Sequence, residues 1–203
     1  MLQFIQRSEQ NQASIRDELL AGLNAVKAFT SPKYLYDALG SRLFEAICEL
    51  PEYYPTRTEA DIFKLHAHAI AQSAGSGTTL IDLGAGNCAK AARLFPSLQP
   101  RQYVPIDISV AFLRDALHRL HLQFPDIEMT GIGMDFSTDL LLPDSVRSER
   151  RLFFYPGSSI GNFSPHEALA FLQRIKRACA EDGGLLIGVD LLKEKSILDA
   201  AYD

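Results

Sequence analysis

A short apolar segment that carries one acid and ends in a glycine turn offers the clearest chemistry in this sequence. Residues 80–90 read Leu-Ile-Asp-Leu-Gly-Ala-Gly-Asn-Cys-Ala-Lys. Gly84 and Gly86, followed by Ala89, fit the loose Gly-x-Gly-x-x-Gly/Ala fingerprint of nucleotide-cofactor loops. Glycines at these positions let the backbone approach a ligand without a Cβ clash. Because a plain strand-to-helix turn could have the same glycines, the side chains around the turn must decide whether a cofactor binds, and which one.

Three acids, a phenylalanine and a lysine discriminate between cofactors. Asp107 comes about 20 residues after the glycine turn, where a carboxylate can accept both hydroxyl protons of a ribose, in NAD and S-adenosylmethionine alike. Asp135 and Phe136 would supply an acceptor for the adenine amine and an apolar wall, which suits a methyltransferase. Asp82 could support the turn or bind the methionine ammonium, and Lys90 could bind the methionine carboxylate. The sequence therefore favours S-adenosylmethionine.

Other interpretations of the same residues stay open at this point. An NAD-linked oxidoreductase could use the same glycine turn, although Asp82 and Asp135 argue against it. A non-catalytic interaction module could keep the fold without the chemistry. Individually, Asp107 could be an acid at a helix N-terminus, Phe136 a core residue and Lys90 a surface lysine.

An alternation of strands and helices from Thr78 onward would position these side chains. The patterns predict strands at 79–83, 103–108, 127–134, 151–155 and 185–189, with helices at 89–98, 109–124, 165–181 and 190–202. Strands joined by helical crossovers form a parallel sheet, and ligands bind beyond the carboxyl ends of its strands. The glycine turn, Asp107, Asp135 and residues 158–162 each follow a different strand, so we expect them to converge. The predicted fold class is α/β, a doubly wound, Rossmann-like parallel sheet.

The chain is expected to divide into two parts. Residues 1–74 would form an N-terminal region of helices and loops that contributes to the substrate pocket, and residues 75–203 would form the cofactor domain. Helices are predicted in the first part at 14–23, 41–50 and 58–73. Residues 51–57 hold two prolines and are predicted to be a loop, with Thr58 as the N-cap of the third helix. Gly75-Ser76-Gly77 would end that helix.

Composition argues against several kinds of partner. The chain has 203 residues, 47% of them hydrophobic and 22% charged, which is typical of globular domains. Its net charge of −5 disfavours nucleic acid. No apolar run approaches the roughly 20 residues of a membrane span, and residues 1–17 lack a signal-peptide core, so no membrane partner is expected. Cys48, Cys88 and Cys179 are widely spaced, which favours a cytoplasmic location over disulfides or a metal site.

Four further segments resemble one enzyme family. They are residues 34–41 (Tyr-Leu-Tyr-Asp-Ala-Leu-Gly-Ser), 50–59 (Leu-Pro-Glu-Tyr-Tyr-Pro-Thr-Arg-Thr-Glu), 156–163 (Pro-Gly-Ser-Ser-Ile-Gly-Asn-Phe) and 201–203 (Ala-Tyr-Asp). They are similar to motifs of the histidine-specific methyltransferases, the L-histidine Nα-methyltransferases of ergothioneine biosynthesis. The resemblance extends from about Ser31 to Asp203, and its tyrosine–proline and glycine–serine–asparagine loops are far more specific than the glycine turn.

The resemblance implies a reaction and a set of site residues. The family transfers methyl groups from three S-adenosylmethionine molecules to the α-amine of histidine, which gives hercynine. By resemblance, the cofactor contacts would be Tyr36, Gly84, Lys90, Asp107, Asp135, Phe136 and Gly157, to which the pattern of the glycine turn adds Asp82 and Gly86. The residues that hold L-histidine would be Tyr53, Asn162 and Tyr202, with Tyr53 and Asn162 as the catalytic residues.

Members of this family continue beyond the position of Asp203, so the resemblance implies that the chain is C-terminally truncated. By resemblance, the missing C-terminal part would carry the last two strands of the sheet, an inserted substrate subdomain and the residues that bind the imidazole ring. The fifth predicted strand, 185–189, would then be an exposed edge through which the chain could self-associate. We therefore expect an intact cofactor site and an incomplete substrate site.

Overall fold

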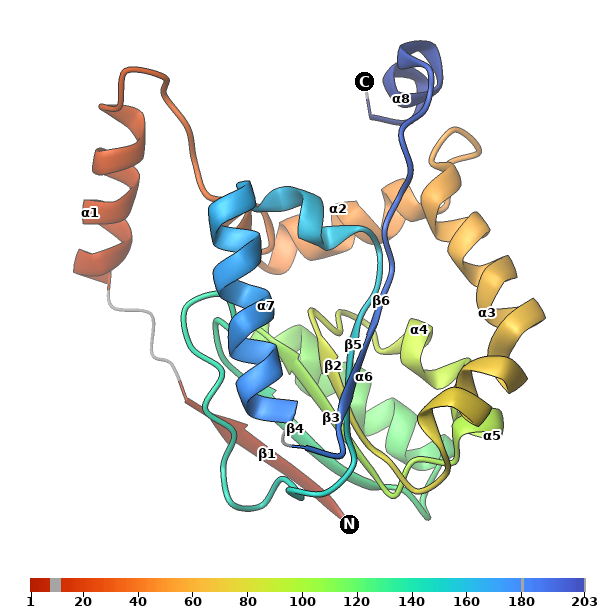
Figure 1. The fold of residues 1–203 in the computed structure, drawn as a ribbon. Helices are drawn as coiled ribbons and strands as arrows, with labels where there is room; N and C mark the ends of the chain where they lie inside the picture. Colours follow the sequence, from red (N-terminus) through yellow and green to blue (C-terminus); the bar gives the residue numbers. More distant parts are fainter. Residues whose placement is uncertain (8–11, 180, 203) are drawn as a thin grey trace.

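The chain folds around a parallel sheet with helices on both faces (Figure 1). The computed structural model describes residues 1–7, 12–179 and 181–202. In these residues the sheet has six strands, in the spatial order β1 (Leu2–Gln6), β4 (Glu128–Gly133), β3 (Gln102–Asp107), β2 (Thr79–Leu83), β5 (Arg151–Tyr155) and β6 (Gly184–Ile187). Every pairing is parallel, so the predicted α/β fold class is confirmed.

Side chains of the central strands alternate between two cores, because successive residues of a strand point to opposite faces of the sheet. Leu80 belongs to one core with Phe63 and Leu117, which α3 and α6 supply. The next residue, Ile81, belongs to the other core with Phe171, which α7 supplies. Burial on both faces explains why β2 reads as a nearly continuous apolar run in the sequence.

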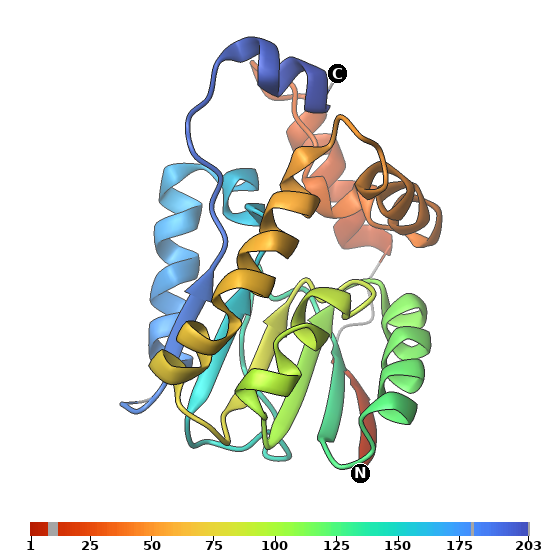
Figure 2. The ribbon, with the colours of Figure 1, turned by 90° about the vertical axis from the view of Figure 1, so that its right-hand side faces the viewer.

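The connecting segments form the helices. In chain order they are α1 (Gln12–Leu23), η1 (Pro32–Leu35), α2 (Ala38–Cys48), α3 (Tyr54–Ala74), α4 (Ala89–Ala92), α5 (Phe95–Leu98), α6 (Val110–Gln123), η2 (Ser159–Asn162), α7 (Pro165–Cys179) and α8 (Lys195–Tyr202). Helices α2 and α8 lie beyond the carboxyl ends of the strands (Figure 2). A capping box starts α7: the N–H of Ser164 donates to Glu167 Oε2 at 2.8 Å, and the N–H of Glu167 donates to Ser164 Oγ at 3.4 Å.

Strand β1 corrects the prediction that residues 1–74 contain only helices and loops. It pairs with β4 from Leu2 opposite Met129 to Gln6 opposite Gly133. The sheet therefore has a sixth strand that the sequence patterns did not indicate. Phe4 and Ile5 are the partly buried residues of β1, so its apolar signal is short. Its hydrogen bonds to the edge of β4, far away in the sequence, are what hold it extended.

Helix α3 starts earlier than predicted. Tyr53 is its N-cap and Tyr54 its first residue, so Thr58 lies inside the helix and residues 54–57 are not a loop. Pro55 is tolerated there because the first N–H groups of a helix have no partner within the helix. Gly75 ends the helix with a φ of 75°, as the sequence predicted. The early start places both tyrosines of the tyrosine–proline motif at the helix N-terminus.

Other predicted helices are shorter in the structure. Residues 89–98 form two short helices. In one continuous helix the ring of Pro96 would clash with the carbonyl four residues before it, whereas proline is tolerated in the first turn of α5. Residues 190–194 are not helical, and α8 begins at Lys195. Helix α7 ends at Cys179; the predicted extension includes Ala180, which like Asp203 lies outside the described residues.

The two ends of the sheet are formed by β1 and β6. Strand β6 pairs with β5 on one side, from Leu152 opposite Gly184 to Tyr155 opposite Ile187, and it is the last strand on the other side within the described residues. Both the open edge at this strand and self-association through it stay predictions. In the described ranges, none of the helices has both the length and the apolar character that crossing a bilayer requires.

Candidate functional site

The glycine turn and Asp107 meet at the carboxyl ends of β2 and β3. Gly84 and Gly86 have φ values of 73° and 52°, a backbone conformation that L side chains rarely adopt. The N–H of Gly86 donates to Asp107 Oδ2 and the N–H of Ser109 to Asp107 Oδ1, both at 2.9 Å. Apart from its chain neighbours, no atom of the described residues lies within 4 Å of where a Cβ on Gly86 would be. The turn thus presents bare backbone beside a fixed carboxylate.

Asp82 lies beneath the glycine turn. The residue is 1% exposed, Tyr103 Oη donates to its Oδ2 at 2.7 Å, and its Oδ1 has no hydrogen-bond partner among the described residues. The pKa of Asp82 is raised to about 7, mainly by burial and also by the charges of Asp107 and Glu59, while the Tyr103 bond and the Lys90 charge oppose the rise. The sequence allowed Asp82 either to support the glycine turn or to bind the methionine ammonium. Its buried position favours the first role.

We expect Asp82→Asn to change how stability depends on pH. Because the folded pKa of Asp82 lies above the ordinary value of 3.8, the folded chain keeps a proton that the unfolded chain releases. The parent therefore loses free energy of unfolding as the pH rises from about 4 to about 7, by about 1.4 kcal/mol for each unit of pKa difference. Asparagine has no such proton, so the variant should lack this loss. Urea unfolding at about pH 5 and about pH 8 measures the difference.

The matched control is Asp126→Asn, since Asp126 is exposed in the turn after α6. This variant should keep the pH dependence of the parent. If the stability of Asp82→Asn fell between the two pH values as much as that of the parent, the carboxylate of Asp82 would not have the raised pKa.

Phe136 borders the glycine turn from the segment after β4, and Asp135 precedes it in the chain. A ring carbon of Phe136 lies 3.7 Å from where a Cβ on Gly84 would be, so the ring faces the turn. Asp135 Oδ1 accepts the N–H of Ser137 at 3.0 Å, and Asp135 Oδ2 lies 3.4 Å from Lys33 Nζ. The structure thus brings the predicted apolar wall to the turn. It also places beside Asp135 a lysine that the sequence patterns did not single out.

Tyr36 approaches the same region from the N-terminal part of the chain. Ser109 Oγ donates to the backbone carbonyl of Tyr36, and Ser41 Oγ donates to the same oxygen at 3.3 Å. Burial raises the pKa of the Tyr36 hydroxyl, and the nearby Asp107 carboxylate raises it further. Because Ser109 also bonds to Asp107, it links the segment after η1 to the carboxyl end of β3.

Edge-to-face contacts join Tyr36, Phe44, Tyr53 and Tyr202, which we call the aromatic group. Phe44 bridges Tyr36 and Tyr53 with centroid distances of 5.9 and 6.1 Å. The rings of Tyr53 and Tyr202 lie 5.6 Å apart with their planes inclined by 84°. Burial, followed by the influence of Tyr202, raises the pKa of Tyr53 well above its ordinary value. The Tyr53 hydroxyl therefore keeps its proton at neutral pH and can donate a hydrogen bond.

Asn162 ends η2, in the segment after β5, and its side chain is exposed. This segment is tied to the start of α3 through Asp190: the Asp190 N–H donates to Ser158 Oγ at 3.0 Å, and Tyr54 Oη donates to Asp190 Oδ2. In the described part of the chain no hydrogen bond or ring contact joins Asn162 itself to the aromatic group. The structure therefore connects the two motifs that are predicted to hold substrate, and it does so through a residue that the sequence did not mark.

Lys90 and Gly157 both contact a second unmarked residue, Glu59 of α3. Lys90 Nζ lies 2.7 Å from Glu59 Oε2, and the Gly157 N–H donates to Glu59 Oε1 at 2.6 Å. Glu59 belongs to the tyrosine–proline motif, and its sequence position suggested only an acid in the first turn of a helix. Its contacts with residues far along the chain could not be derived from that pattern.

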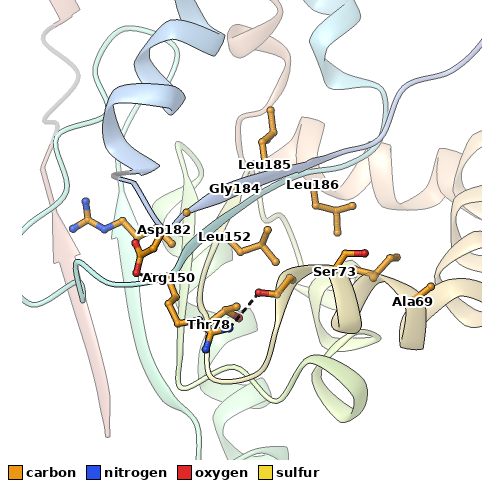
Figure 3. Close-up of a pocket in the computed structure, with 13 residues that line it drawn as sticks. Ala69, Ser73, Thr78, Arg150, Leu152, Asp182, Gly184, Leu185 and Leu186 are labelled. Atoms are coloured by element: carbon orange, nitrogen blue, oxygen red, sulfur yellow. Dashed lines mark hydrogen bonds between the residues drawn. The ribbon is translucent and has the colours of Figure 1, made fainter.

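A groove of about 450 Å³ lies at the opposite end of the sheet (Figure 3). It is lined by the end of α3 and by the starts of β5 and β6, with Leu152 and Leu186 as its apolar wall and Arg150 and Asp182 near one end. None of the predicted site residues lines it. Because ligands of parallel sheets bind beyond the carboxyl ends of the strands, this groove is not the candidate cofactor site.

Solved structures share this fold. The magnesium protoporphyrin IX methyltransferase of Synechocystis PCC 6803, solved with bound S-adenosylmethionine, matches with a TM-score of 0.57 at 12% identity, over 86% of this chain and 85% of that one. At this identity the likeness shows the fold alone. The six parallel strands and this match define the class of fold: a Rossmann-like domain with the architecture that this methyltransferase also has.

Sequence comparison identifies the family. Residues 15–203 match the histidine-specific, S-adenosylmethionine-dependent methyltransferases, and the chain belongs to that family. The histidine N-alpha-methyltransferase of Mycolicibacterium smegmatis is 37% identical over 194 residues, which are 94% of this chain and 60% of that protein. The 4-dimethylallyltryptophan N-methyltransferase of Claviceps purpurea is 26% identical over 209 residues, 97% of this chain and 61% of that protein. The chain thus spans about 60% of the length of these relatives.

Family membership confirms the resemblance that the sequence motifs indicated. It identifies S-adenosylmethionine as the cofactor and decides against the nicotinamide alternative. The site fits this cofactor on structural grounds: the open backbone at Gly86 leaves room for a ligand, and Asp107 offers a fixed carboxylate beside it.

Proposed function

We propose that this chain forms the cofactor-binding part of an N-methyltransferase that acts on the α-amine of L-histidine. The observation that carries the proposal is convergence: the glycine turn, Asp107 and Phe136 follow three different strands and meet at one edge of the sheet. The N-terminal region brings the aromatic group to the same edge through Tyr36. The 37% identity with a histidine N-alpha-methyltransferase supports histidine as the substrate.

The cofactor half of the site has a role for each predicted residue. Asp107 accepts the ribose hydroxyls, Phe136 covers the adenine ring, and Asp135 accepts the adenine amine. Lys90 binds the methionine carboxylate, and Asp82 supports the turn from below. The remaining contacts are backbone or packing contacts, from Gly84, Gly86, Gly157 and Tyr36.

The substrate half works by positioning. S-adenosylmethionine supplies a methyl group on a sulfonium that is open to in-line displacement, so a neutral amine held on that axis needs no strong base. Asn162 can donate to the substrate carboxylate and accept from its amine. The hydroxyls of Tyr53 and Tyr202 can bind the amino acid, and their ring faces tolerate the cation that grows as methyl groups accumulate. We assign residues 1–74 the role of completing this pocket.

Mass spectrometry of a reaction with S-adenosylmethionine and L-histidine tests the proposal, with the chain extended to the full length of its relatives. Histidine should gain up to three methyl groups, all on the α-amine, as tandem fragmentation would show. Preferential methylation of a different amine offered in the same mixture would contradict the assignment of histidine.

A second candidate substrate is another amino-acid-type amine. The relative named as a 4-dimethylallyltryptophan N-methyltransferase matches 97% of this chain, although at 26% identity. A mixture of L-histidine and L-tryptophan derivatives at equal concentration separates the two candidates, and we expect histidine to be consumed first.

A further inference from the structure

Lys90 of the proposed cofactor site forms an ion pair with Glu59, which has no role assigned so far. Lys90 Nζ and Glu59 Oε2 are 2.7 Å apart, with side chains that are 33% and 13% exposed. A half-buried pair of this kind is costly to desolvate, so stability alone does not account for its place in the candidate site. Lys90 lies in α4, the helix that follows the glycine turn.

The carboxylate of Glu59 is held between Lys90 and the backbone of two glycines. The Gly157 N–H donates to its Oε1 at 2.6 Å, and a Cβ on Gly188 would come within 2.4 Å of the same oxygen. A Cβ on Gly157 would come within 2.8 Å of Lys90 Nζ. The two glycines thus leave just enough room for the pair, at the carboxyl ends of β5 and β6.

The chemistry of the pair matches one part of the cofactor. The methionine end of S-adenosylmethionine is a zwitterion, with an α-ammonium and an α-carboxylate on the same carbon. An acid and a lysine held side by side present the complementary charges, and hydrogen bonds between charged groups are the strong ones. Without ligand the two side chains pair with each other, so neither of these half-buried charges is left unpaired.

We propose that Glu59 binds the α-ammonium of the cofactor while Lys90 binds its α-carboxylate, so that the ion pair opens to receive the zwitterion. This inference rests on the proposed cofactor site and adds Glu59 to it. Binding exchanges one internal ion pair for two between protein and ligand. Gly157 then positions Glu59 through its N–H, which explains why a loop placed beside the substrate contacts a carboxylate of α3.

Calorimetric titration with three ligands tests the role of Glu59. The ligands are S-adenosylhomocysteine, its deaminated analogue, and 5′-methylthioadenosine, which lacks the whole amino-acid end. The parent should prefer S-adenosylhomocysteine over the deaminated analogue by about 10- to 100-fold. In Glu59→Gln this preference should fall to about one, while the affinity for 5′-methylthioadenosine stays within about twofold of the parent. The control Asp61→Asn changes an exposed acid of the same helix and should keep the full preference.

Three results would overturn the inference, and they are distinguishable. An unchanged preference in Glu59→Gln would show that Glu59 does not meet the ammonium. An equal loss of affinity for all three ligands would show that the ion pair only maintains the fold of the cleft. If the folded parent bound none of the ligands, the proposed cofactor site itself would fail, and the role of Glu59 with it.

Discussion

Asp107→Ala should lower the affinity for S-adenosylhomocysteine by about 100-fold or more. In the proposed site the Asp107 carboxylate accepts both ribose hydroxyls, and each hydrogen bond to a charged group contributes about 1.5–3 kcal/mol. The same carboxylate accepts the N–H groups of Gly86 and Ser109 at 2.9 Å. Its removal therefore also frees the glycine turn and the segment that holds Tyr36. Isothermal titration calorimetry of the variant and the parent measures the loss.

Asp126→Ala provides the matched control, because it removes an exposed acid at a turn away from the glycine loop. It should keep the parent affinity within about twofold. Circular dichroism melts of both variants establish that they are folded. A folded Asp107→Ala protein with the affinity of the parent would show that the ribose does not bind at the end of β3.

Asn162→Ala should separate the two halves of the site. Asn162 is exposed at the end of η2 and makes no contact with the glycine turn among the described interactions, so the affinity for S-adenosylhomocysteine should stay within about twofold. In the chain extended to the full length of its relatives, the affinity of the S-adenosylhomocysteine complex for L-histidine should fall by about 10- to 100-fold, because the carboxylate and amine of the substrate lose their shared partner. Two successive calorimetric titrations give both values.

Asn24→Ala, at an exposed asparagine after α1, controls for the substitution itself and should leave both affinities unchanged. An equal drop in the two affinities of a folded Asn162→Ala protein would mean that the assignment of cofactor and substrate halves is wrong. Unchanged histidine affinity would remove Asn162 from the substrate site.

The strands that carry the site were predictable because they are buried on both faces. Parallel strands of this kind read as apolar runs, and β2, β3 and β5 appear in the sequence within a residue or so of their observed bounds. The rule that ligands gather at the carboxyl ends then placed Gly86 and Asp107 together, and the hydrogen bond between them confirms that placement.

The remaining features depend on long-range contacts that one sequence does not display. Strand β1 has a weak apolar pattern and is held by pairing with β4. Tyr54 and Pro55 read as a loop, yet they begin α3, because a helix start tolerates proline. Two ion pairs, Lys33 with Asp135 and Glu59 with Lys90, join segments that are distant in the sequence. Charged side chains on a helix or loop are more often solvated, so the sequence pattern does not indicate these pairs.

Hydrogen–deuterium exchange with and without S-adenosylhomocysteine most directly tests the central claim, that side chains from separate strand ends form one cofactor site. We predict slower amide exchange on binding in the segments that follow four strands: 84–90, 107–109, 135–137 and 156–162. Slower exchange confined to the groove at the other end of the sheet, at 69–74 and 182–186, would contradict the account, as would protection of one of the four segments alone.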